Sequence, residues 1–262
     1  MNILTIDTST DIEFIALSVN EKIFQYSDNA KMSHSVTMFD NLSLLLSQGS
    51  ITIDEIDLIG TGIGPGSFTG IRIAVSTARM FAQILKIPLV GIKSQEIYAA
   101  SVQGFGNKTV LAAFDAKKSK VFAGVYELRG SDPHVIAGLT RNLSSDSHVI
   151  AGLTRNLSSD LYEIIEPNDY YMADILEAIK SETEIKEIIC IGDGCEKYID
   201  IIDNFSKKND FFYTKIDNFH PNGKAAIELT LRKYNESREK YINFEDTVPF
   251  YARKSDAELS KT

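Results

Sequence analysis

The sequence predicts a mixed α/β protein that begins with a meander of strands and continues with helices and strands in alternation. Three short runs near the N-terminus are rich in β-branched and other apolar side chains, with turns but no helix between them. Two longer segments, residues 34–48 and 70–86, carry apolar side chains at helical spacing instead. A later set of strands and helices repeats this order in weaker form.

The first strand is expected at residues 3–6, where β-branched side chains alternate, and the polar run at 7–10 supplies turn chemistry. Strands at 14–18 and 22–26 complete an antiparallel meander. This order differs from the immediate strand–helix alternation of a dinucleotide-binding domain.

A helix over 34–48 is followed by a buried strand at 56–62, which leads into the glycine-rich loop 64–70. The next helix covers 72–86, and Pro88 ends it. The later elements are a strand at 89–92, a helix at 95–102, a strand pair at 109–114 and 121–127, a helix at 172–181, a strand at 187–191, a helix after Gly194 and a long helix at 222–236.

One segment interrupts this order. A 14-residue unit that begins at Asp132 is followed by a near copy that ends at Ser159, and the two differ only where Pro133 becomes Ser147. Two copies are too few and too short for a solenoid. We interpret 132–159 as a duplicated insertion in a surface connection, where added length costs little loop entropy.

Composition and charge restrict the class of protein. The 262 residues are 44% hydrophobic and 24% charged, which is typical of a soluble globular protein, and no apolar run is long enough for a membrane span. The N-terminus does not resemble a signal peptide, so we expect a cytoplasmic protein with reduced thiols at Cys190 and Cys195. A net charge of −9 argues against a primary RNA-binding protein, although contact with RNA inside a complex stays open.

The loop between the buried strand and the second long helix is the most distinctive stretch. Its candidate site residues are Gly64, Gly66, Ser67, Thr69 and Arg72, together with Asp7 in the turn after the first strand. A helix N-terminus can hold an anion, but no lysine stands where a P-loop needs one. The simpler interpretation is favoured: the glycines make a tight turn, Ser67 or Thr69 caps the helix, and Asp7 forms an Asx-turn.

The two long helices are apolar on more than one side. Such helices are either deep in a large core or covered by a partner, and both alternatives stay open. We favour a subunit interface, and its candidate residues are Met38, Leu42, Leu45, Ile73, Thr77 and Met80. Periodicity leaves open which side faces the partner.

The sequence shows no catalytic constellation. His34 and His220 stand alone, and His134 and His148 recur only because the 14-residue unit recurs, so no zinc or iron site is expected. A GxSxG elbow is also missing. We therefore name no catalytic residue and no metal ligand.

Several segments match a known family in order along the chain. They are MNILTIDTS at 1–9, His34-Ser35, GPGSFTGIR at 64–72, GDGCEKY at 192–198 and VPFYAR at 248–253. Together these segments resemble the TsaB family, also called YeaZ, over nearly the whole chain except about 130–160. The resemblance implies a two-lobed fold of the actin, sugar-kinase and chaperone-ATPase superfamily, with mixed sheets flanked by helices. We expect one lobe at 1–103 and the other at 104–262, with a C-terminal helix or tail that returns to the first lobe.

The resemblance also implies a role. TsaB-like proteins pair with the catalytic paralogue TsaD, assemble with the small ATPase TsaE, and act in the transfer of threonylcarbamoyl to adenosine 37 of tRNA. The family uses its first two helices, here 34–48 and 70–86, as the dimer interface. The implied function is that of a non-catalytic scaffolding and activating subunit that holds no cofactor of its own, in a complex that uses ATP. An isolated chain is expected to form a homodimer through the same helices. The alternative is a small-molecule kinase or another ATP-dependent enzyme of the same superfamily.

Overall fold

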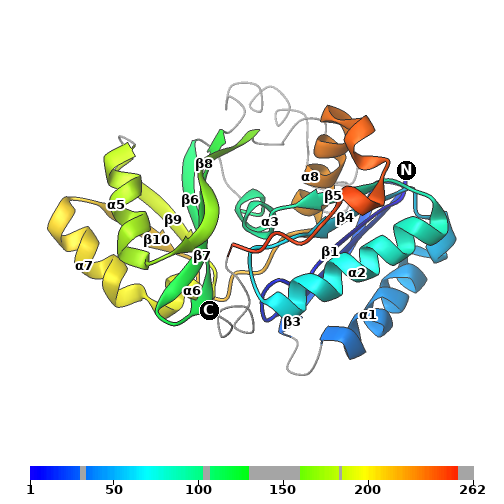
Figure 1. Ribbon diagram of the computed structural model, residues 1–262, viewed down its shortest axis with the longest axis horizontal. Coiled ribbons are helices and arrows are strands. Elements are labelled where there is room, and N and C mark those ends of the chain that lie inside the picture. Colours follow the sequence, from blue (N-terminus) through cyan, green and yellow to red (C-terminus); the bar gives the residue numbers. More distant parts are fainter. Residues whose placement is uncertain (30–33, 103–106, 130–159, 183–184, 253–262) are drawn as a thin grey trace, which may run out of the picture.

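The computed structural model describes residues 1–29, 34–102, 107–129, 160–182 and 185–252, and the duplicated unit at 132–159 lies outside them. The described chain forms two lobes side by side, each built on one five-stranded sheet (Figure 1). The boundary predicted at 103/104 falls in the short segment 103–106, which is also outside the described residues.

The sheet of the first lobe has the order β3-β2-β1-β4-β5. Its strands are β1 (Ile3–Asp7), β2 (Ile12–Val19), β3 (Lys22–Asn29), β4 (Leu58–Gly62) and β5 (Leu89–Ile92). β1 pairs antiparallel with β2 and parallel with β4, β2 pairs antiparallel with β3, and β4 pairs parallel with β5. The predicted meander is therefore confirmed, followed by a parallel half.

The second sheet repeats this arrangement in the order β8-β7-β6-β9-β10. Its strands are β6 (Lys108–Lys117), β7 (Lys120–Arg129), β8 (Asp160–Tyr170), β9 (Glu187–Ile191) and β10 (Phe212–Lys215). As β1 does in the first sheet, β6 pairs antiparallel with the next strand, β7, and parallel with β9. Two mixed sheets of one topology confirm the two similar lobes that the resemblance implied.

The first sheet is covered by helices on both faces. α1 (His34–Gly49) and α2 (Phe68–Leu85) pack on one face, and α8 (Gly223–Glu236) packs on the other (Figure 1). Because successive strand residues face opposite sides, Leu4 and Ile6 of β1 join the core under α1 and α2, whereas Ile3 joins the core under α8. Thr5 also faces α8, where its hydroxyl lies 2.9 Å from that of Thr230.

The second sheet is covered by helices from both lobes. α5 (Met172–Glu182) and α7 (Ile199–Asn209) pack on its outer face, and α6 (Asp193–Lys197) precedes α7. The inner face receives α3 (Ser94–Ala100), which follows β5 of the first lobe; Tyr98 of α3 packs against Phe114 and Tyr126 of the second sheet. One helix of the first lobe thus completes the core of the second.

The chain returns to the first lobe after β10. α8 is followed by two short 3-10 helices, Arg238–Tyr241 and Phe244–Asp246, and a third such helix, Ile53–Glu55, precedes β4. Phe250 donates its backbone N–H to the carbonyl of Ile63 at 2.7 Å, so the last described residues lie along the glycine-rich loop. Among the residues that the structure describes, no helix is both long and apolar enough to cross a bilayer.

Candidate functional site

The glycine-rich loop brings the N-terminus of α2 against the turn that follows β1. A Cβ added to Gly66 would overlap the carbonyl oxygen of Ser9, and one added to Gly70 would overlap that of Thr8. Across this contact Ser67 donates its backbone N–H to the Ser9 carbonyl at 2.6 Å, and the Thr8 hydroxyl donates to the Gly70 carbonyl at 2.7 Å. These glycines are therefore needed for close approach of two backbone segments.

Ser67 caps α2. Its hydroxyl accepts a hydrogen bond from the backbone N–H of Gly70 at 3.3 Å. The predicted helix cap at Ser67 is thereby confirmed. Thr69 is exposed in the first turn, and Gly64 has a φ of 98°, in the region that favours glycine. At this helix end, the cap uses one of the backbone donors that an anion would otherwise meet.

Asp7 forms the expected Asx-turn. Its Oδ1 accepts from the backbone N–H of Ser9, two residues on, at 2.7 Å, and the side chain is buried. The carboxylate lies where a Cβ on Gly62 would stand, so the last glycine of β4 makes room for it. Asp7 thus has a structural role in joining the strands to the loop.

A cleft of about 400 Å³ lies between the lobes beside this turn. The turn after β1 and the end of β6 both contribute residues to this cleft. β1 and β6 occupy equivalent positions in the two sheets. Its lining residues are Ser9, Thr10, Asp11, Gly66, Ser67, Phe68, Phe114, Asp115, Ala116, Lys117, Phe122, Asp193, Phe250, Tyr251 and Ala252. Aromatic rings form much of the wall, and the charged side chains in the lining are three aspartates and one lysine.

The aspartates of the second lobe are electrostatically unlike each other. Burial works to raise the pKa of Asp115, but hydrogen bonds from Lys117 and Lys197, each 2.8 Å from Oδ2, lower it to about 2. Burial raises the pKa of Asp193, and the nearby charges of Asp115 and Asp11 add to the rise. A phosphate placed here would face these carboxylates, so anion binding would require a neutralising cation.

Arg72 belongs to an aromatic stack with Phe68 and Tyr251. Its guanidinium lies 4.0 Å from the ring centroid of Phe68, and its Nε donates to the hydroxyl of Tyr251 at 3.1 Å. The rings of Phe68 and Tyr251 are themselves 4.8 Å apart. Sequence reasoning missed this stack, because no local pattern predicts that residue 251 returns to residue 72.

The structure corrects the predicted partner-facing side of α1. Met38, Leu42 and Leu45 are 0%, 3% and 2% exposed and belong to the core of the first lobe, because their side of α1 packs on the sheet. Thr77 of α2 is also buried, and Ile73 is partly buried. Of the predicted set, only Met80 is well exposed, at 40%.

Other apolar residues of the two helices lie on the surface. Phe39, Leu44 and Ile84 are exposed large hydrophobic residues that the predicted set omitted. The ring of Phe39 lies 6.4 Å from that of Phe81, so the two helices meet at this point. Beside it a groove of about 440 Å³ is lined by Met38, Phe39, Phe68, Thr69, Arg72, Ile73, Ser76 and Thr77. We define the α1/α2 surface as Phe39, Leu44, Ile73, Met80 and Ile84.

Curated proteins with similar sequences match this chain over about half of its length. A curated "tRNA threonylcarbamoyladenosine biosynthesis protein TsaB" of Buchnera aphidicola subsp. Schizaphis graminum is 34% identical over 125 residues, which are 47% of this chain and 60% of that protein. The protein of the same name from Bacillus subtilis is 33% identical over 130 residues, 49% of this chain and 56% of that protein. The matches thus span less than two thirds of these relatives.

Solved structures agree on the fold over almost the whole chain. A crystal structure of an uncharacterized Pseudomonas aeruginosa protein with similarity to peptidase YEAZ superimposes with a TM-score of 0.70, covering 96% of this chain and 99% of that one at 19% identity. A structure of YeaZ from the same organism gives 0.64, with 95% and 99% covered at 19% identity.

The family model described as "TsaD: tRNA N6-adenosine threonylcarbamoyltransferase" matches residues 26–261. That match covers most of the chain and includes α1, α2 and the glycine-rich loop. The chain therefore belongs to this family, and within it to the TsaB proteins.

Proposed function

We propose that this protein acts in tRNA threonylcarbamoyladenosine biosynthesis as a non-catalytic subunit. In this role it binds a TsaD-type catalytic partner through the α1/α2 surface, supports the docking of TsaE, and contacts tRNA only within the assembled complex. The names of the curated relatives support the pathway. The observation that carries the subunit role is the exposed apolar surface of α1 and α2.

The α1/α2 surface has the chemistry of a protein interface. Ile84 is 68% exposed and Met80 is 40% exposed on the same side of α2, one turn apart. The helix carries no acidic residue, and its only basic residues are Arg72 and Arg79. A centre depleted in charge with arginine nearby is typical of interfaces, where apolar surface gains free energy when a partner covers it.

The interlobe cleft is consistent with a role that needs no chemistry from this chain. The carboxylate of Asp115 is held by Lys117 and Lys197, and Asp7 is used in the turn after β1. Both groups thereby stabilise the fold of the cleft. The alternative kinase function would place a nucleotide in this cleft, so calorimetry with ATP and magnesium on the purified chain separates the two functions.

The partner-binding role is tested by Met80→Glu in a co-purification and affinity measurement with the TsaD paralogue of the same cell. Covering the exposed part of a methionine contributes about 1 kcal/mol, and an unpaired carboxylate buried at the same point costs several kcal/mol more. We expect the dissociation constant to rise about a hundredfold or more. The homodimer of the isolated chain should weaken in parallel, as measured by analytical ultracentrifugation.

Ile201→Glu is the matched control. Ile201 is 39% exposed on α7, so the substitution introduces the same charge at nearly equal exposure on the other lobe. We expect this variant to bind the partner as the unmodified chain does. Unchanged binding by folded Met80→Glu, or equal losses for both variants, would contradict the assignment of the interface.

A further inference from the structure

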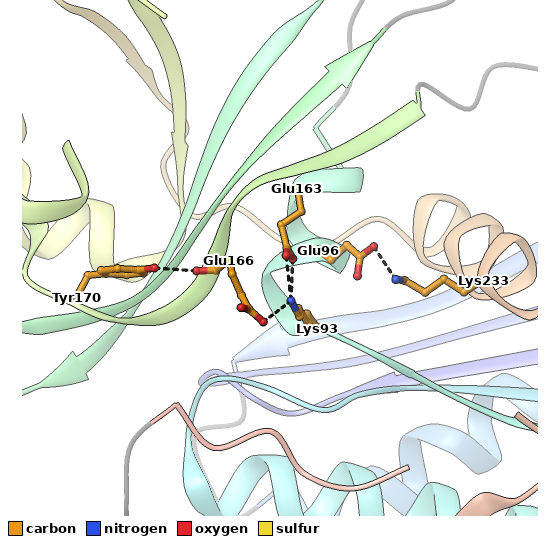
Figure 2. A network of polar contacts seen from close by, with 6 residues as sticks. All are labelled: Lys93, Glu96, Glu163, Glu166, Tyr170 and Lys233. Carbon is orange, nitrogen blue, oxygen red and sulfur yellow. Dashed lines mark hydrogen bonds and ion pairs between the residues drawn. The ribbon is translucent and has the colours of Figure 1, made fainter. Parts of the chain in front are cut away.

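The corner between β5 and α3 contacts the second lobe through a lysine. Lys93 directs its Nζ to both oxygens of Glu163, at 3.1 and 2.9 Å, and to Oε1 of Glu166 at 2.9 Å (Figure 2). An ammonium group has three N–H donors, so these contacts match its full capacity. The lysine belongs to the first lobe, and both carboxylates belong to β8 of the second.

A β-bulge places both carboxylates on the same side of β8. Residues three apart in a regular strand point to opposite faces. Tyr126 of β7 pairs with Glu163 and its neighbour Val125 pairs with Ile165, so β8 has one extra residue between these pairs. Because of this extra residue, the side chain of Glu166 points to the same side of β8 as that of Glu163. Both carboxylates can therefore reach Lys93. The irregularity of β8 therefore has a defined structural consequence.

Neighbouring residues of the same corner join both lobes to the glycine-rich loop. Gln95 is fully buried, and its Nε2 donates to the carbonyl of Pro65 at 3.0 Å and to that of Phe122, on β7, at 3.1 Å. Ser94 exchanges hydrogen bonds with Gly64, through its N–H at 2.9 Å and its hydroxyl at 3.2 Å. These hydrogen bonds thus connect the second lobe to the loop that starts α2.

Lys93 is only 25% exposed at its side chain, so its charge is partly removed from water. Burial works to lower the pKa of Lys93, whereas the hydrogen bonds and charges of Glu163 and Glu166 raise it above the ordinary value. The ammonium therefore stays charged. Without it, two neighbouring carboxylates would repel each other at the lobe boundary.

We infer that Lys93, Glu163 and Glu166 form an interlobe latch that sets the opening of the cleft. The latch is a positioning device: it acts through Gln95 and Ser94 on the glycine-rich loop, and it does not depend on the proposed function. A second ion pair, Lys233 to Glu96 at 2.8 Å, ties α3 to α8 on the first-lobe side, so the corner moves with the first lobe (Figure 2).

The opening of the cleft can be measured by electron–electron double resonance between spin labels on the two lobes. Gln48→Cys on α1 and Glu177→Cys on α5 place the labels at exposed helix positions. Figure 1 shows α1 and α5 in different lobes, on opposite sides of the molecule. The native Cys190 and Cys195 are buried and are not labelled. Dilution with unlabelled chain makes each measured distance intramolecular.

Lys93→Met should lengthen the mean distance between the labels and broaden its distribution, because two carboxylates then face each other without a cation. Lys93→Arg keeps the charge and should retain the distribution of the unmodified chain. Lys207→Met, at an exposed position on α7, is the control for loss of a lysine and should have no effect.

An unchanged distribution in Lys93→Met, or equal opening in Lys93→Met and Lys93→Arg, overturns the latch. If circular dichroism shows that Lys93→Met does not fold, the variant with both Glu163→Gln and Glu166→Gln tests the latch in its place. The latch predicts a broader distribution for that variant as well, and an unchanged one overturns it.

Discussion

The contact between the start of α2 and the turn after β1 predicts the effect of Gly70→Ala with a definite sign. Gly70 is in the first turn of α2, and helix propensity alone predicts that alanine stabilises a helical glycine position by about 0.5–1 kcal/mol. At this position, however, the new Cβ would overlap the carbonyl oxygen of Thr8. That oxygen belongs to the backbone, so it cannot rotate away as a side chain would.

The size of the loss in stability depends on the backbone shift that the new Cβ requires. Overpacking of a close contact costs about 1–3 kcal/mol, and a backbone partner places the cost at the upper end of that range. Shifting α2 also weakens the buried hydrogen bond from Thr8 to the Gly70 carbonyl, 2.7 Å long, a contribution of about 1 kcal/mol. After the gain in helix propensity, we expect a net loss of about 2–3 kcal/mol in the free energy of unfolding.

Urea denaturation followed by circular dichroism measures this loss. Ser76→Ala, at an exposed position of the same helix, is the control and should be neutral or slightly stabilising. If Gly70→Ala proved as stable as the unmodified chain, or more stable, the close-approach explanation of the glycine motif would be refuted.

Two further predictions concern buried carboxylates. Thr37→Val removes a 2.6 Å hydrogen bond to the buried Glu13 and should lower the free energy of unfolding by about 2 kcal/mol in urea; a change below about 0.5 kcal/mol would contradict the anchoring of α1 by this bond. The pKa of Asp115 falls from 3.8 to about 2 on folding, so its stabilisation is complete above pH 3.8 and is lost as the pH falls towards 2. Stability measured against pH should therefore fall more steeply below pH 4 in the unmodified chain than in Asp115→Asn, and parallel curves would contradict this.

Local sequence patterns predicted much of the fold. The meander, the two long helices of the first lobe and the pair β6 and β7 follow from side-chain periodicity and turn residues, which depend on neighbours in the sequence. β10 was missed because its four residues carry too short a pattern. β8 follows the inserted unit, and its bulges break the alternation that identifies a strand.

The site was less predictable because it depends on tertiary contacts. Periodicity identified two apolar sides on each long helix, but the sheet decides which one is buried, so Met38, Leu42 and Leu45 entered the core. The partnership of Arg72 with Tyr251 and that of Lys93 with Glu163 join residues far apart in the chain. The cap by Ser67 and the Asx-turn of Asp7 are local contacts, and both were predicted.

The most direct test of the subunit role is a threonylcarbamoylation assay reconstituted from this chain, TsaD and TsaE of the same cell, with each protein omitted in turn. Modified adenosine in tRNA should require this chain and should fall to background when it is left out or replaced by Met80→Glu. The Asp115→Asn variant should retain activity at neutral pH, because the carboxylate serves the fold and not the reaction. Full modification without this chain would contradict the account.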